Sequence, residues 1–116
     1  MKLGHLELFV TDPLRSMAFY RNVLGFDVTV IQGDQFVWLQ SGQQELLLRA
    51  GLQTGAAPSY GRSRIALVLY TDDLAASLQK LHEHGLTPQV MAESDACYTF
   101  TDPDGHWLQL VNPATQ

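Results

Sequence analysis

The two halves of the chain carry the same signals for starting and ending a helix, and this repeat constrains the fold more than any other feature. Asp12 and Asp72 are placed to cap a helix, and Gly25 and Gly85 are placed to end it. The interval from Asp12 to Gly25 is 13 residues, and the interval from Asp72 to Gly85 is the same. Equal spacing of these signals indicates an internal repeat of roughly 60 residues.

Alternating and β-branched residues predict one strand before each helix and three strands after it. We expect strands at 4–11, 26–31, 36–40 and 45–49, and again at 64–70, 87–91, 97–101 and 106–111. One such βαβββ module is too small to bury its own sheet. The sequence therefore predicts a single α+β domain over 1–116, with modules at 1–50 and 64–116 and a flexible linker at 51–63. The modules are expected to form a cupped, barrel-like mixed sheet of eight strands, with the helices outside.

Composition excludes several classes of function. The net charge is −5 and the seven Lys and Arg residues are scattered, so we expect no nucleic-acid partner. No run approaches the roughly 18 apolar residues of a membrane helix, and no signal peptide opens the chain, so we expect a cytoplasmic protein with no membrane partner. The single cysteine, Cys97, rules out a disulfide within the chain and is expected to be a small buried residue.

The predicted strands have two chemically different faces. One face is aliphatic and is expected to lie under the helices. The other mixes aromatic, amide and ionisable side chains, which is typical of the lining of a ligand pocket. Glu45 and Leu47 belong to this mixed face. We expect a small-molecule ligand to be bound there by nine residues: His5, Glu7, Phe9, Phe36, Trp38, Gln40, Arg49, Trp107 and Gln109.

Two motifs carry a resemblance to a known family. The first is the run Ser-Met-Ala-Phe-Tyr-Arg-Asn-Val-Leu-Gly-Phe at 16–26, and the second is Asp-Pro-Asp-Gly-His at 102–106. Together with His5 at the start of the first strand, they make the chain resemble the vicinal-oxygen-chelate superfamily, which includes glyoxalase I, bleomycin-resistance proteins and extradiol dioxygenases. The resemblance covers essentially the whole chain and implies paired βαβββ modules.

The resemblance also implies up to four metal ligands on the inner face, and this chain keeps only part of them. His5 matches the first ligand, and Glu45 is a candidate for the second unless Leu47 occupies that position. The position in the second module falls on Arg64 or Ala66, and the final ligand, normally Glu, is Gln109. We therefore expect no cofactor, with a divalent metal (Zn, Ni, Fe or Mn) on His5 and Glu45 as the alternative. His106 is expected to be a surface residue.

Two functions from different classes follow. The first is a metal-free protein that binds or sequesters a planar or aromatic ligand, antibiotic-like or a metabolite, as in the bleomycin-resistance branch. Aromatic residues would stack on the ligand, Glu7 and Glu45 would attract positive charge, and Arg49 would favour an anionic group. The alternative is a metal-dependent glyoxalase-like lyase, isomerase or dioxygenase that uses His5 and Glu45. The resemblance further implies a homodimer, because family pockets often lie at that interface.

Overall fold

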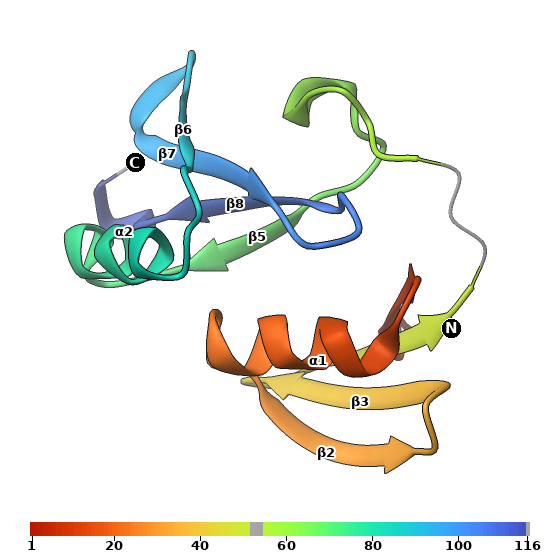
Figure 1. The fold of residues 1–116 in the computed structure, drawn as a ribbon. Coiled ribbons are helices and arrows are strands. Elements are labelled where there is room, and N and C mark those ends of the chain that lie inside the picture. The colour runs from red at the N-terminus through yellow and green to blue at the C-terminus, as the bar shows by residue number, and fades with distance from the viewer. Residues whose placement is uncertain (52–54, 116) are drawn as a thin grey trace. The chain divides into compact units, whose positions relative to one another are not determined.

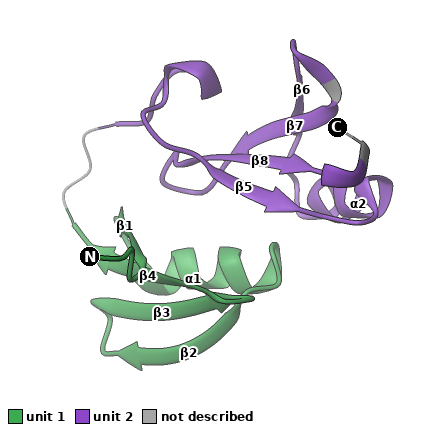
Figure 2. Cartoon of the chain, turned by 180° about the vertical axis from the view of Figure 1, so that it is seen from behind, with its two compact units in different colours: residues 1–54 green, residues 55–116 purple. Residues whose placement is uncertain are grey.

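The chain divides into two compact units that have the same architecture. The computed structural model describes residues 1–51 and 55–115, and the units comprise residues 1–54 and 55–116 (Figures 1 and 2). Each unit contains one α-helix and a four-stranded mixed sheet, so the predicted α+β fold of two βαβββ modules is confirmed. The strands hydrogen bond as two sheets of four rather than as the single sheet of eight that the sequence predicted.

In the first unit, the sheet has the order β1-β4-β3-β2, with β1 parallel to β4 and the other neighbours antiparallel. A parallel pair needs a long connection, and here the helix and the two intervening strands supply it. The elements are β1 (Leu6–Val10), α1 (Pro13–Asn22), β2 (Asp27–Gln32), β3 (Phe36–Ser41) and β4 (Gln44–Ala50).

The ends of α1 follow from local sequence. The Asp12 side chain accepts hydrogen bonds from the backbone N–H groups of Leu14 and Arg15, at 3.1 and 3.3 Å. Pro13 occupies the first helical turn, where its missing N–H costs nothing. Gly25 has a φ of +78°, a backbone conformation that suits glycine and ends the helix. The helix lies across one face of the sheet, over β3 and β4 (Figure 1).

The aliphatic face of this sheet forms the core of the first unit, as predicted. Leu8 pairs with Leu48 on the neighbouring strand, and Leu39 pairs with Leu46, which places these side chains on one face. None of the core side chains on this face is more than 7% exposed: Leu8, Val10, Val37, Leu39, Leu46 and Leu48. From α1, Tyr20 and Ser16 are fully buried.

The second unit repeats this plan with the sheet order β5-β8-β7-β6, in which β5 is parallel to β8. Asp73, the neighbour of the predicted Asp72, caps the helix by accepting a hydrogen bond from the backbone N–H of Ala76 at 3.0 Å, and Gly85 ends it with a φ of +83°. The interval from cap to glycine is therefore 12 residues in this unit and 13 in the first. The elements are β5 (Leu67–Tyr70), α2 (Leu74–Glu83), β6 (Gln89–Met91), β7 (Ser94–Thr101) and β8 (Trp107–Val111), with 3-10 helices at Tyr60–Arg62 and Pro113–Thr115. No helix in the described part of the chain is long and apolar enough to cross a membrane.

Two predicted segments differ from the structure. The strand predicted at 64–70 begins only at Leu67, whose partner is Leu108 on β8. The strand β8 starts at Trp107, directly after a turn, so it does not extend far enough to pair with residues 64 and 65. In the predicted linker, residues 52–54 lie outside the described residues, but residues 55–63 contain the 3-10 helix Tyr60–Arg62 and belong to the second unit.

Candidate functional site

The face of the first sheet that α1 does not cover carries the mixed set of side chains that the sequence predicted. Strand register places Glu7, Leu47 and Trp38 side by side across β1, β4 and β3. Phe9, Arg49 and Phe36 form the next row in the same way. We call this surface the polar face; its members are His5, Glu7, Phe9, Phe36, Trp38, Gln40, Glu45, Leu47 and Arg49. Both Glu45 and Leu47 therefore belong to it, and Leu47 is the buried one at 2% exposed.

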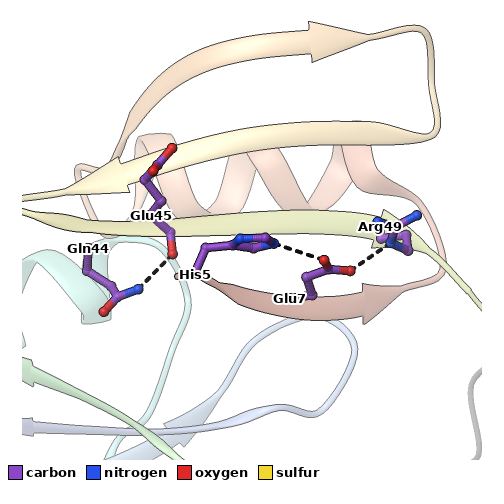
Figure 3. Close-up of polar contacts among 5 residues, drawn as sticks. All are labelled: His5, Glu7, Gln44, Glu45 and Arg49. Carbon is purple, nitrogen blue, oxygen red and sulfur yellow. Dashed lines mark hydrogen bonds and ion pairs between the residues drawn. The ribbon is translucent and has the colours of Figure 1, made fainter. Parts of the chain in front are cut away.

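A row of three ionisable side chains crosses the polar face. Glu7 accepts a hydrogen bond from His5 Nε2 on Oε2 at 2.9 Å and one from Arg49 Nε on Oε1 at 2.8 Å (Figure 3). The three side chains are 31–37% exposed, so solvent and small molecules can reach them. Because Glu7 and Arg49 lie 42 positions apart in the chain, only the pairing of β1 with β4 brings them together.

Two aromatic side chains of β3 hold this row from the side. The His5 ring meets the Trp38 ring edge-on, with centroids 4.7 Å apart and planes at 62°. The Arg49 guanidinium lies over the Phe36 ring, 4.8 Å from its centroid, which is a cation–π contact. The polar face thus combines matched charges with aromatic surface over three strands.

The protonation of the row follows from its hydrogen bonds. The Arg49 N–H group, and then the His5 N–H group, lower the pKa of Glu7 below its ordinary value. Glu7 is therefore a carboxylate near neutral pH and can only accept hydrogen bonds. Consequently His5 Nε2 must carry the hydrogen, and the Nε2 lone pair is not available to a metal ion.

Of the other predicted residues of this face, Glu45 and Gln40 lie apart from the row, whereas Phe9 is opposite Arg49. Glu45 is exposed, and no hydrogen bond or ion pair joins its carboxylate to His5 (Figure 3). The Gln40 amide donates to the backbone oxygen of Gly42 in the adjacent turn at 3.0 Å. Phe9 is 50% exposed and packs against Gly51, where an added Cβ would lie 2.9 Å from the Phe9 ring.

In the second unit, Trp107 and Gln109 of β8 are both engaged by the segment 55–63. The Trp107 indole N–H donates to the backbone oxygen of Ala57 at 2.9 Å. The Tyr60 hydroxyl donates to Gln109 Oε1 at 3.1 Å, and the Tyr60 and Trp107 rings meet edge-on, 6.3 Å between centroids. Burial, and to a smaller extent the charge that the Cys97 thiol would carry, raises the pKa of Tyr60.

Sequence reasoning missed Tyr60 because it lies in a segment of small and polar residues. Tyr60 is the only aromatic residue between 51 and 63, and this was the signal that could have identified it. Cys97 is buried, as predicted.

In the turn before β8, the structure corrects the predicted exposure of His106. His106 was predicted to be a surface residue, but its side chain is only 24% exposed, and its Nδ1 lies 2.8 Å from Asp102 Oδ2. The Asp102 carboxylate is fully buried and also accepts the backbone N–H groups of Asp104 and His106. Gly105, with a φ of +87°, packs so closely on Ala56 that a Cβ there would overlap the Ala56 Cβ. The Asp-Pro-Asp-Gly motif thus stabilises this turn through its first carboxylate.

The two registers identify which residues occupy the metal positions that the family resemblance implies. Glu7 pairs with Leu47 in the first unit, and Val68 pairs with Gln109 in the second, so Leu47 rather than Glu45 corresponds to Gln109. By the same correspondence, the position of His5 is taken by Ala66 in the second unit. Among the described residues, no group of three or more His, Cys, Asp or Glu could hold a metal ion. Since Leu47, Ala66 and the amide Gln109 stand at the other positions, the residues present do not fit a divalent metal site of that type.

Solved structures with the same fold include proteins of several activities. A lactoylglutathione lyase from Agrobacterium tumefaciens is 18% identical, with 99% of this chain and 96% of that one covered and a TM-score of 0.73. An antibiotic binding protein from Streptomyces sp. CB03234 is 24% identical, with 97% and 98% covered and a TM-score of 0.73. A fosfomycin resistance protein from Listeria monocytogenes, solved with Mn(II), is 15% identical, with 96% and 91% covered and a TM-score of 0.75. These likenesses concern the fold.

A comparison with curated protein sequences finds no significant match. A family model does match, over residues 2–110 and hence over nearly the whole chain. With its two βαβββ units, the chain belongs to the Glyoxalase/Bleomycin resistance protein/Dioxygenase superfamily, the group of vicinal-oxygen-chelate proteins that its motifs resemble.

Proposed function

We propose that this protein binds a planar, aromatic small molecule on the polar face of its first unit, without a metal ion. The ligand would be an antibiotic-like compound or a metabolite, which the protein sequesters. The observation that carries the proposal is the row His5–Glu7–Arg49 flanked by Trp38 and Phe36, five partly exposed side chains that combine hydrogen-bonding groups with aromatic surface.

The chemistry of these side chains supports binding rather than metal catalysis. Aromatic rings offer offset-stacked or edge-on contacts worth roughly 0.5–1.5 kcal/mol each beyond the area they bury. The charged row is held in place by its own hydrogen bonds before any ligand arrives, which lowers the entropic cost of binding. A metal-dependent lyase, isomerase or dioxygenase is the weaker reading, because His5 Nε2 donates to Glu7 and Glu45 does not join them. The existence of an antibiotic binding protein with this fold is a reason to include antibiotics among the probes.

The two tryptophans allow a direct test of the site. In a Trp107→Phe variant, Trp38 is the only tryptophan, and in a Trp38→Phe variant only Trp107 remains. We expect planar aromatic probes, such as anthraquinones, flavins and naphthalene derivatives, to quench the fluorescence of the Trp107→Phe variant in a saturable way. The Trp38→Phe variant lacks the tryptophan of the polar face, and its titration shows how much of the quenching arises at Trp107.

Two controls make this experiment decisive. N-acetyltryptophanamide, titrated in parallel, corrects for absorption of light by the probes. The titration is repeated on protein dialysed against EDTA, and metal content is measured before and after dialysis. Absence of saturable Trp38 quenching over the whole panel would refute the proposed function. Stoichiometric Zn, Ni, Fe or Mn whose removal abolishes binding would favour the metal-dependent alternative instead.

A further inference from the structure

The charged side chains of the polar face differ in how many of their hydrogen-bonding groups are already used, and this difference indicates the charge of a suitable ligand. Both oxygens of Glu7 already accept hydrogen bonds, one from His5 and one from Arg49. Each oxygen keeps a second lone pair, but the positive charge of Arg49 beside it already offsets the attraction that the carboxylate would exert on a cation. The carboxylate is therefore poorly placed to attract a cation, contrary to the role that the sequence predicted for it.

Arg49 has the opposite character, because most of its donors remain unused. A guanidinium has five N–H donors, and here the one on Nε goes to Glu7. In the described part of the chain, no protein acceptor meets the donors on Nη1 and Nη2. The side chain is 37% exposed, and contact with Phe36 on one side and Glu7 on another holds the guanidinium in one orientation. A fixed, half-exposed guanidinium with its outer edge open suits an oxyanion.

The carboxylates of Glu45, on the polar face, and of Asp27, on β2, lie at the other end of the sheet. Glu45 and Asp27 are both level with Gln40, whereas Arg49 is level with Phe36. Four residues along a strand separate Glu45 from Arg49, which is roughly 13 Å. This distance exceeds the Debye length of about 8 Å at physiological ionic strength, so these carboxylates repel an anion at Arg49 only weakly.

We propose that the ligand is an aromatic carboxylate, whose carboxylate is bound by the Nη groups of Arg49 and whose ring system lies against Trp38. Trp38 is diagonal to Arg49 across the β3–β4 pair, a spacing that a two-ring aromatic acid can span. This inference rests on the proposed function and adds to it the charge of the ligand and the residue that selects it.

The test compares three probes of one shape on the Trp107→Phe variant: 2-naphthoate, the neutral 2-naphthamide and the cationic 2-naphthylmethylamine. Charge-assisted hydrogen bonds are about twice as strong as neutral ones, so we expect 2-naphthoate to bind about tenfold more tightly than the amide. The cation should bind most weakly. In Arg49→Gln, 2-naphthoate should lose this advantage, while the amide keeps its affinity within about twofold.

Matched variants separate a selective role of Arg49 from a structural one. Arg21→Gln, on the exposed side of α1, makes the same change in net charge away from the polar face and should leave the preference unchanged. Glu7→Gln should keep or strengthen binding of 2-naphthoate, because it removes a neighbouring negative charge.

Each adverse outcome has a distinct meaning. Equal affinity of the Trp107→Phe variant for 2-naphthoate and the amide would refute the anion preference and leave the proposed function intact. Equal loss of both probes in Arg49→Gln would assign Arg49 a structural role only. Tighter binding of the cationic 2-naphthylmethylamine would refute the proposal and indicate that the carboxylates of the polar face select the ligand. No saturable quenching by any of the three would count against the proposed function itself.

Discussion

At the scale of single residues, Glu7 organises the polar face. It lies between two hydrogen-bond donors, His5 and Arg49, and its side chain is partly exposed to solvent. Its position on β1 follows from the alternation in the sequence, but its partners depend on which strand pairs with β1. The sequence predicted that the negative charge of Glu7 would attract a ligand, whereas in the structure this carboxylate orients the side chains of His5 and Arg49.

The depressed pKa of Glu7 predicts how stability depends on pH. A carboxyl group with a folded-state pKa below its unfolded value of 4.5 stabilises the fold above that pH, and the contribution is lost as pH falls through the folded-state pKa. Glu7→Gln should therefore weaken the loss of stability below pH 4.5, measured by urea unfolding from pH 7 to pH 3. Glu45→Gln, which removes a carboxylate not joined to His5 or Arg49, is the control. An unchanged acid profile in Glu7→Gln would contradict this account of the row.

At the scale of elements, the segment 55–63 changes the description of the second unit. The sequence predicted a linker, and its Gly, Ala, Ser and Pro content supports that reading locally. The structure instead has a short 3-10 helix, whose Tyr60 reaches Gln109, and a backbone oxygen at Ala57 that accepts from Trp107. Gly105 leaves room for Ala56 at the same place. The polar side chains of β8 are thus satisfied from within their own unit.

The Tyr60 contact predicts a measurable contribution to stability. Tyr60→Phe removes one half-buried hydrogen bond to Gln109, and we expect a loss of about 0.5–1.5 kcal/mol in the free energy of unfolding at pH 8. Because the pKa of Tyr60 is raised above 10.0, the wild type should lose stability as pH rises above that value, and Tyr60→Phe should lose less. Tyr70→Phe, at a ring 74% exposed, is the matched control. If both variants unfold as the wild type does, the segment makes no energetic contribution through Tyr60.

At the scale of the whole molecule, the two units repeat one topology but not one chemistry. Equivalent strand positions carry Glu7 and Val68, Arg49 and Val111, and Trp38 and Thr99. Among the described residues, the positions in the second unit that are equivalent to Glu7 and Arg49 therefore carry no charge. A duplicated fold has here kept its aliphatic faces, which stabilise each sheet, while the opposite faces have diverged.

Exposed apolar side chains on the edge strands support the predicted homodimer. Val30 and Ile31 on β2, and Val90 on β6, are about half exposed at sheet edges that have no further strand in the described chain. We expect light scattering at micromolar concentration to give about twice the mass of 12.9 kDa. Charged substitutions on both edge strands, Ile31→Lys with Val90→Lys, should shift the protein to the monomer. A mass of one chain for the wild type at all concentrations would refute the dimer.

The fold was predictable from the sequence because its signals are local. Asp12 caps the first helix as predicted, and Asp73, next to the predicted Asp72, caps the second. Gly25 and Gly85 end the helices, and alternation along each strand separates an aliphatic face from a polar one. The motifs at 16–26 and 102–106 were sufficient to indicate the family. The strand predicted at 64–66 was wrong, and residues 60–62 of the predicted linker form a 3-10 helix.

The sequence by itself thus determined two βαβββ modules, their helix ends, their buried faces and the family. Only the tertiary structure decided that Glu7 is paired with Arg49, that Trp107 and Gln109 bond to the segment 55–63, and that Leu47 rather than Glu45 corresponds to Gln109. The physical reason is separation along the chain. Caps and strand faces depend on neighbours within a few residues, whereas these contacts join residues 42 to 50 positions apart and exist only once the strands have paired in register.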